Sequence, residues 1–600
     1  MQQRPHPNSP FQTPGNRTAD QQRLCPNIKP MKQWKLKDPP SGETRHTLPE
    51  NLSPVMVRLL LTRGIDSAER LRLFLNPPHR LPHCPMRLDG MEAALQLLNQ
   101  AVASSANGSA RELAGIMGDF DVDGITGTAI LTETLADFGL DAVPYLPDRI
   151  SEGHGLSEEA VRHFSALGAS LIFTVDCGAS SHNEVKLANS LGIRVIVTDH
   201  HVPPADPPAA YAIINPGTPG NQYPFPQLCG AGLALKLAQG LYRMQGMPAP
   251  SALLELAALG TIADMVPLVD ENRFLVTQGL AELSRTRRPG LKAMYRLAGL
   301  ENKPINTERV AFQVAPRLNA AGRMGQAGDS LQLLVTRDEN EAEILARRLE
   351  SQNQERRELT AAAFEAAAAK LDLREDIPPF IFIDGPEITP GVAGLVAGRL
   401  AREYQRPAVA LASVGEDIFV GSGRSIPTFN LVNAFNECSD LFLRHGGHSQ
   451  AAGFSVRREN VPALEARLCG IAATHLAHTD PAPALEIDAE IGLSELTPTL
   501  LSELELIEPF GVANPRPIFM SRGLKVEEMY RIGKAGQYLK LVVSDGRQRF
   551  PVLVFNRAAE WERGTERIDL AFTLTADVWQ GKTRCSLVAE DYRVAGAGDT

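Results

Sequence analysis

Acidic residues alternate along the stretch from Gly118 to Gly124, which reads Gly-Asp-Phe-Asp-Val-Asp-Gly. It follows an apolar run directly and precedes a helical pattern. In an extended segment, alternate side chains point to one side, so Asp119, Asp121 and Asp123 would repel one another unless a cation lies among them. Oxygen-only clusters suit hard divalent ions such as Mg²⁺ or Mn²⁺. Taken alone, the stretch fits an acidic turn with capping aspartates equally well.

Two later apolar segments end in the same way. Residues 169–175 lead to Asp176, and residues 193–198 lead to the Asp-His-His of 199–201. Short apolar runs that alternate with helical patterns are typical of a parallel α/β sheet, and ligands bind at the carboxyl edge of such sheets. Because three separate segments deliver possible ligands to that edge, we predict a metal centre there.

A fourth carboxylate, Asp264, ends the apolar helical pattern that begins at 253. A negative charge at the carboxyl end of a helix opposes the helix dipole. A nearby cation would offset this charge, which adds modest support for the metal centre.

In series, Asp-x-Asp-x-Asp-Gly, Thr-Val-Asp-x-Gly, Asp-His-His and Gly-Thr-Ile-Ala-Asp-Met-Val-Pro-Leu resemble the motifs of the DHH phosphoesterase superfamily. Within it, the chain is similar to the RecJ-like single-stranded-DNA-specific exonucleases from about residue 50 to 595. The resemblance implies two divalent ions, Mn²⁺ or Mg²⁺. The ligands that it implies for one ion are Asp123, Asp176, His200 and Asp264. Asp119 and Asp121 with Asp176 would hold or orient the other, and Asp119 is either a ligand or the carboxylate that sets the field around the ligands.

Chemistry supports such a pair independently of the resemblance. Two divalent ions about 3.5–4 Å apart clamp the attacking and leaving oxygens of an in-line displacement at phosphorus. The neutral imidazole of His200 suits Mn²⁺ better than Mg²⁺, so we expect Mn²⁺ to support activity well. We expect His201 either to orient a ligand or to contact phosphate.

Two segments of the expected catalytic domain offer contacts to a substrate. Arg149 lies on a glycine-rich loop, 147–156, where it could fork onto a phosphate or form a structural salt bridge. In this loop His154 stands where the related proteins carry Tyr. The segment 315–323 reads as a loop of small residues, and the resemblance places it by the DNA path, with the candidate contacts Arg317, Asn319 and Arg323.

A second α/β unit begins near 380 and resembles the DHHA1 substrate domain. Its glycine-rich loops at 420–425 and 446–453 could present backbone N–H groups to phosphate. By resemblance, Ser422 and Arg424 act with Arg149 on the 5′-terminal phosphate. The further candidates are Gly446, Gly447 and His448, of which His448 would stabilise the scissile phosphate. Relatives often carry His before the Gly-Val-x-Gly stretch, whereas here Thr389-Pro390 stand there.

The C-terminal part alternates apolar and polar residues over 538–543, 550–555 and 570–574, which predicts a small β-barrel. The segment 508–517 resembles the one that leads into the OB-fold of RecJ-like proteins. Such a barrel binds single strands by stacking bases on aromatic side chains beside cations. Candidates that are equally compatible with core or ordinary surface are Tyr538, Trp579, Lys540 and Arg531.

The chain of 600 residues is too long for one hydrophobic core. We expect an α/β protein with a parallel-sheet DHH catalytic domain, an α/β DHHA1 domain and an OB-type β-barrel. The expected parts are a disordered tail at 1–45, a helical segment at 46–110, the DHH domain at 111–337, a helical connector at 338–372, the DHHA1 domain at 373–480 and the OB-fold at 481–600. Met31 within the tail is an alternative start.

Composition limits the cellular compartment in which the protein is expected. No apolar run approaches the ~20 residues that span a bilayer, and no secretory signal is recognisable. The seven cysteines include no CxxC pair, which indicates a reduced, cytoplasmic protein without structural zinc. The net charge of -10 still permits a local basic groove for nucleic acid.

The predicted metal centre together with the resemblance implies a metal-dependent 5′→3′ exonuclease that hydrolyses single-stranded DNA to mononucleotides, and the resemblance alone implies a role in repair and recombination. We expect a monomer that meets a helicase and a single-strand-binding protein. One alternative is a DHH phosphoesterase for oligonucleotides or small phosphate substrates, which would not need the barrel. Another is a non-catalytic DNA-binding scaffold, which predicts eroded ligands, whereas every acidic and histidine ligand is intact.

Overall fold

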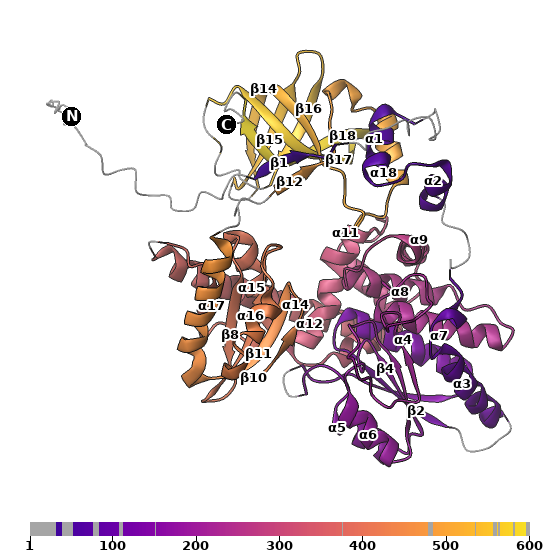
Figure 1. Ribbon diagram of the computed structural model, residues 1–600. Coiled ribbons are helices and arrows are strands. Elements are labelled where there is room, and N and C mark those ends of the chain that lie inside the picture. The colour runs from indigo at the N-terminus through magenta and orange to yellow at the C-terminus, as the bar shows by residue number, and fades with distance from the viewer. Residues whose placement is uncertain are drawn as a thin grey trace, which may run out of the picture. The chain divides into compact units, whose positions relative to one another are not determined.

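The computed structural model forms two compact units, and each is described by itself (Figure 1). Of the described residues, the smaller unit holds those within Ala362–Ile388 and Ala393–Pro483, and the larger unit holds those within Gln33–Ala361, Thr389–Val392 and Ala484–Thr600. The structure describes residues 32–38, 52–75, 83–106, 112–149, 152–374, 376–477, 484–533, 536–555, 561, 564–579 and 582–595. Most of the expected tail at 1–45, including Met31, lies outside these ranges.

A five-stranded parallel sheet of order β3-β2-β4-β5-β6 organises the larger unit (Figure 1). Its central strands are the predicted apolar segments, and the edge strands β3 and β6 were not predicted. Alternate side chains enter two separate cores, so that Phe173 faces one and Ile172 the other, because helices cover both faces. The strands are β2 (Leu113–Gly118), β3 (Asp141–Tyr145), β4 (Leu171–Val175), β5 (Arg194–Thr198) and β6 (Ala212–Ile214).

The helices around this sheet include the predicted apolar helix that precedes Asp264. They are α3 (Met91–Ala106), α4 (Val122–Asp137), α5 (Glu158–Ala166), α6 (His182–Ser190), α7 (Gly230–Met244), α8 (Ala252–Ala263), α9 (Asp270–Ser284), α10 (Pro289–Leu297), α11 (Thr307–Arg309), the π-helix Val310–Val314, α12 (Ala315–Met324) and α13 (Gly328–Val335). The long α14 (Glu339–Asp372) begins in the larger unit, and its residues from Ala362 onward belong to the smaller unit. Among the described residues, no helix is both long and apolar enough to cross a membrane.

The expectation that 315–323 forms a loop is wrong, because this segment lies in helix α12. Pro316 occupies the first turn, where a missing N–H costs no hydrogen bond. Its small residues allow the helix to pack closely against neighbouring segments, and they do not form an open loop. A Cβ added to Gly322 would lie 2.5 Å from the backbone oxygen of Phe120, inside the acidic stretch.

The smaller unit is built on a five-stranded mixed sheet of order β10-β11-β9-β8-β7. The predicted glycine loop at 446–453 is largely a hairpin of β10 and β11, and only its turn is irregular. Phenylalanine side chains such as Phe435 and Phe454 fill the core. The elements are β7 (Ile381–Asp384), α15 (Pro390–Tyr404), β8 (Ala408–Ser413), β9 (Ile418–Arg424), α16 (Leu431–Asn436), β10 (Phe442–Gly447), β11 (Ala451–Arg457) and α17 (Val461–Leu476).

The C-terminal strands form the predicted barrel. The sheet of order β13-β14-β15-β16-β18-β17 closes on itself through pairing of β14 with β17 (Figure 1). The strands are β13 (Ala489–Glu490), β14 (Phe519–Ile532), β15 (Tyr538–Ser544), β16 (Arg549–Val554), β17 (Arg567–Trp579) and β18 (Lys582–Val594). Short strands β1 (Gln33–Leu36) and β12 (Ala484–Ile487) pair in parallel beside it.

The first helices contribute to two different cores. Helix α1 (Pro54–Thr62) buries Met56 and Leu60 in the barrel core, and α2 (Ala68–Leu75) follows it. The Ser53 N–H donates a 2.8 Å hydrogen bond to Glu503 of α18 (Pro498–Leu506). Helix α3, by contrast, packs into the core of the parallel sheet. The segment 46–110 is thus shared between the barrel and the sheet.

We predict that Leu60→Ala loosens the barrel and leaves the parallel sheet intact. Leu60 is fully buried, and Leu→Ala changes at such sites cost about 2–5 kcal/mol. Hydrogen exchange measured by mass spectrometry should speed up in β14 to β18 and stay unchanged in β2, β4 and β5. Leu73→Ala on α2 is the control, because Leu73 is 48% exposed. Faster exchange in both sheets would contradict the assignment of α1 to the barrel core.

Candidate metal centre

The loops that follow the central strands bring the predicted ligands together. Asp119 follows β2, Asp176 follows β4, and His200 follows β5. The Nε2 atom of His200 lies 2.9 Å from Asp176 Oδ1, 3.7 Å from an oxygen of Asp264 and 3.9 Å from an oxygen of Asp123. Three groups have ligand atoms within 4.8 Å of one another, namely Asp123, His200 and Asp264; Asp119, Asp121 and Asp176; and Asp176, His200 and His201.

The acidic stretch itself is extended only as far as Asp121. Asp121 is the N-cap of α4, and its carboxylate accepts hydrogen bonds from the N–H groups of Asp123 (3.0 Å) and Gly124 (3.3 Å). Asp123 therefore lies in the first turn of a helix, where the positive end of the helix dipole stabilises its negative charge. One aspartate caps the helix while all three carboxylates stay at the sheet edge.

The carboxylate of Asp123 is gripped by the start of α7. The N–H groups of Gly230 and Ala231 donate to its two oxygens at 2.6 and 2.9 Å. A Cβ on Gly260 of α8 would lie 2.6 Å from Asp123 Oδ1, so only glycine leaves room there. Sequence reasoning missed this cradle. The signal was the Cys-Gly-Ala-Gly run at 229–232, which opens an apolar helix with residues too small to cover its N–H groups.

Electrostatics at the edge favour a cation. Burial, and then repulsion from Asp123 and neighbouring aspartates, raises the pKa of Asp176 well above its ordinary value. The same two causes raise the pKa of Asp264 to about 8. Asp119 Oδ1, Asp176 Oδ1 and His200 Nε2 are buried and make no hydrogen bond, so the 2.9 Å approach of the last two is not one. Atoms oriented in this way fit shared metal ions.

The two histidines have opposite environments. Burial lowers the pKa of His200, which keeps its imidazole neutral and able to bind a metal. The side chain of Asp199 lies 2.8 Å from His201 Nδ1, and this contact raises the pKa of His201 to about 9. Asp199 is fixed in turn by the Ala179 N–H at 2.8 Å. His201 is therefore suited to carry a positive charge toward an anion.

The backbone at Asp176 is unusual. Its φ is +63°, in the left-handed region that non-glycine residues rarely adopt, and Gly178 follows at +105°. Asp tolerates this region better than most residues. Such conformations persist where the surrounding structure over-determines them, as at functional sites.

The other predicted residues of the larger unit lie around the acidic stretch in different ways. Arg149 stacks 4.5 Å from the Phe120 ring centroid, and His154 Nε2 lies 3.6 Å from Asp119. Asn319 accepts a 3.1 Å hydrogen bond from the Val122 N–H and so supports the stretch from α12. Arg317 pairs with Glu350 of α14, and Arg323 lies near the end of α12.

Three of the candidate substrate residues of the smaller unit, Ser422, Arg424 and Gly446, share one face of its sheet. Strand pairing aligns Ser422 with Gly453 and Gly453 with Gly446, and both glycines are exposed. Arg424 donates to Ser422 Oγ at 3.2 Å, and Gly394 of α15 leaves space for both side chains. Gly447 has a φ of +140°, and the exposed His448 begins the turn between β10 and β11.

Two barrel candidates lie on the surface in accessible positions. The half-buried Tyr538 packs edge-on against Phe555 with ring centroids 5.2 Å apart, and Phe555 is 46% exposed. Lys540 is exposed on the same strand. Arg531 donates to the Gly536 carbonyl at 3.4 Å, and the side chain of Trp579 lies outside the described residues.

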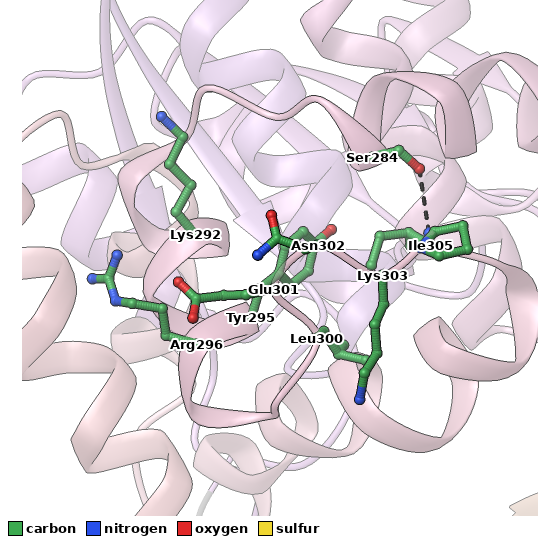
Figure 2. Close-up of a pocket in the computed structure, with 10 residues that line it drawn as sticks. Ser284, Lys292, Tyr295, Arg296, Leu300, Glu301, Asn302, Lys303 and Ile305 are labelled. Atoms are coloured by element: carbon green, nitrogen blue, oxygen red, sulfur yellow. Dashed lines mark hydrogen bonds between the residues drawn. The ribbon is translucent and has the colours of Figure 1, made fainter. Parts of the chain in front are cut away.

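A separate polar hollow of about 470 Å³ lies beside α10 (Figure 2). Figure 2 shows its basic side chains pointing in different directions, and Arg296 already pairs with Glu343 at 2.7 Å. None of the predicted site residues lines it. Its lining residues are Ser284, Lys292, Tyr295, Arg296, Leu300, Glu301, Asn302, Lys303, Pro304 and Ile305.

Known proteins match this chain over most of its length. Three family models match, the DHH family N-terminal domain over 114–261, the DHHA1 domain over 378–474 and the RecJ OB domain over 487–591. The single-stranded-DNA-specific exonuclease RecJ of Bacillus subtilis is 36% identical, with 94% of this chain and 71% of that protein covered. The protein of that name from Escherichia coli is 33% identical, with 91% and 96% covered. The chain belongs to the RecJ family.

Solved RecJ structures agree with this assignment. The crystal structure of RecJ from Thermus thermophilus in complex with Mn²⁺ superposes with a TM-score of 0.81 at 31% identity, with 94% of this chain and 79% of that chain covered. A second structure of the same protein holds Mg²⁺ and gives a TM-score of 0.74 at 30% identity. The family and fold expected from the motifs are therefore confirmed, as is the expectation of Mn²⁺ or Mg²⁺ as cofactor.

We predict that Gly260→Ala weakens metal binding in this RecJ-family centre. The new Cβ would press on Asp123 Oδ1 and on Ala231, and both are held by a helix. Mn²⁺ affinity measured by calorimetry should fall, while the circular dichroism spectrum stays unchanged. Gly328→Ala, also on a helix but with open space around it, should leave the affinity as it is. Equal affinities in all three proteins would show that the Asp123 cradle is not needed.

Proposed function

We propose that the chain is a metal-dependent exonuclease that degrades single-stranded DNA from its 5′ end to mononucleotides in DNA repair and recombination. The observation that carries this proposal is the buried group of carboxylate and imidazole atoms without hydrogen bonds at one sheet edge. Relatives named single-stranded-DNA-specific exonuclease match over most of the chain and support the substrate class.

The residues present fit two divalent ions. Asp123, Asp176, His200 and Asp264 would hold one, and Asp119, Asp121 and Asp176 would hold the other, which makes Asp176 common to both. When bound, such ions supply Lewis acidity at phosphorus and lower the pKa of a water.

The chain's own residues supply orientation and charge. The α7 cradle fixes the Asp123 carboxylate, and the neutral His200 presents Nε2 to the same space. His201, held by Asp199, offers a positive charge to a phosphate oxygen. Arg149 lies beside Phe120 at this edge, where a guanidinium can fork onto phosphate. Together these groups bind and orient a phosphodiester.

The smaller unit carries the proposed end recognition. Ser422 and Arg424 would bind the 5′-terminal phosphate together with Arg149, and His448 would stabilise the scissile phosphate. The exposed row of Gly446 and Gly453 beside Ser422 lets a phosphate approach the backbone closely. Exonucleases need such an end pocket because polarity is set by which terminus is bound.

The remaining expectations stay proposals. We propose that Lys540 and Tyr538 hold the strand on the barrel, where aromatic rings and cations bind single strands without sequence preference. We further propose a cytoplasmic monomer that cooperates with a helicase and a single-strand-binding protein. The proposed boundaries are 111–337 for the DHH domain, 338–372 for the connector, 373–480 for the DHHA1 domain and 481–600 for the OB-fold.

We predict that Asp176→Asn abolishes most of the nuclease activity. Asn also tolerates a positive φ, so the variant should fold and lose only the charge at the shared position. Release of mononucleotides from a 5′-phosphorylated single strand with Mn²⁺ should fall at least ~100-fold, because even groups that only orient metal ligands contribute about 10–100-fold.

A matched control exists on α9. Asp270 also has a positive φ, of 45°, belongs to none of the groups of described residues that could hold a metal, and has half of its side chain exposed. Asp270→Asn should retain wild-type rates. Activity retained by Asp176→Asn, or absent from the wild type with either metal, would overturn the proposed function.

We predict that Arg424→Ala removes the preference for 5′-phosphorylated ends. Hydrogen bonds to charged groups contribute about 1.5–3 kcal/mol, so the rate ratio between phosphorylated and unphosphorylated ends should fall about 10- to 100-fold. The exposed Arg457 on the same sheet is the control for a general loss of positive charge. If Arg457→Ala changes the ratio as much, or if the wild type cuts both ends equally, the end pocket does not exist.

A further inference from the structure

A buried asparagine outside the metal centre connects two segments of the chain, and each segment leads to a candidate metal ligand or to its support. Asn272 lies on α9 and is completely buried. Its side-chain amide donates one hydrogen bond to the carbonyl of Gln227 at 2.7 Å and one to the carbonyl of Pro267 at 3.1 Å. The two acceptors belong to segments that are far apart in the sequence.

Each acceptor lies close to a candidate ligand. Gln227 comes two residues before Cys229, the N-cap of α7, whose first N–H groups hold Asp123. Pro267 comes three residues after Asp264, at the end of a tight turn in which Met265 has a φ of +60°. Asn272 therefore connects the start of α7, which holds Asp123, to the turn that follows Asp264.

The chemistry of this position requires an amide. The two N–H bonds of one Asn side chain can serve two carbonyls at once, which neither a hydroxyl nor an aliphatic group can do. The Oδ1 atom of Asn272 is buried and makes no hydrogen bond, so all hydrogen bonds of this side chain come from its two N–H groups. Burying an unpaired polar atom costs free energy, and such an arrangement indicates a function for the pair of donors.

The residues that follow the Asp264 turn are also held by hydrogen bonds to a different segment, the one that leads into the barrel. The Leu268 N–H donates to the Val512 carbonyl at 2.8 Å, in the segment that leads into the barrel. Arg273, next to Asn272, donates to the carbonyls of Ile507 and Glu508 in that segment. Because the turn is anchored there, loss of Asn272 would change its spacing from the start of α7 and leave the turn itself in place.

We propose that Asn272 is a positioning residue that sets the spacing between Asp123 and Asp264, and thereby the affinity of the centre for a divalent ion. The inference rests on the proposed function in one respect, namely that these carboxylates bind a metal. It assigns Asn272 no contact with substrate.

The test compares Asn272→Leu with Asn460→Leu in the full-length protein. Asn460 is a partly buried asparagine of the smaller unit that donates to the Leu441 carbonyl at 3.1 Å. Binding of Mn²⁺ is measured by titration with electron paramagnetic resonance detection of the free ion, without DNA. We expect Asn272→Leu to weaken Mn²⁺ binding about 10- to 100-fold, the range found for groups that orient metal ligands, and Asn460→Leu to leave it unchanged.

A milder variant, Asn272→Ser, keeps one donor and guards against a failure of Asn272→Leu to fold. It should show a smaller loss of affinity, and excess Mn²⁺ should restore its kcat while KM for DNA stays at the wild-type value. Unchanged affinity in Asn272→Ser and Asn272→Leu, or an equal loss in Asn460→Leu, would overturn the proposal. A wild-type protein that binds Mn²⁺ and cleaves DNA while these variants behave identically to it would overturn this inference alone, whereas a wild type that binds no Mn²⁺ would overturn the proposed function as well.

Discussion

Mutual repulsion among buried carboxylates is the constraint around which the larger unit is arranged. Asp119, Asp123 and Asp176 are almost inaccessible, and burial together with their proximity raises the pKa of each. Within the protein, the N–H groups of α7 offset only part of this charge, because the imidazole of His200 is neutral. The rest of the negative charge must be offset by cations. The carboxylates are therefore stable in their ionised form only when divalent ions are bound, which is the form proposed to be active.

Much of this arrangement could be predicted because it follows from local patterns. Apolar segments that end in Asp176 or His200 specify parallel strands, and parallel strands place their ends at one edge. The cradle of Asp123 could not be predicted in the same way, since Gly230 lies 107 residues further along the chain. Small residues such as those around Gly322 suit a loop and a tightly packed helix equally, so only tertiary contact with Phe120 decides for the helix.

The same limit applies to the edges of the fold. Strand β6 is three residues long, too short for an alternating pattern to be recognised. Asn319 was predicted as a substrate contact, and that role stays a prediction. The structure shows a different contact, in which Asn319 accepts from the Val122 N–H, 197 residues away, and so supports the chain. Sequence patterns identify which side chains carry chemistry, whereas the groups that hold them are found only when distant segments meet in space.

The packing of α1 against the barrel has a consequence for synthesis. The contact between Ser53 and Glu503 joins residues 450 positions apart. At a translation rate of about 5–20 residues per second, roughly 20–90 s separate the appearance of the two partners. During that interval Met56 and Leu60 have no barrel core to enter, whereas all strands of the parallel sheet and the residues of its acidic edge have been made before the interval ends. The segments of the proposed centre for cleavage are thus synthesised before the barrel proposed to hold the strand, and the apolar face of the first helix stays without its partner until the end of synthesis.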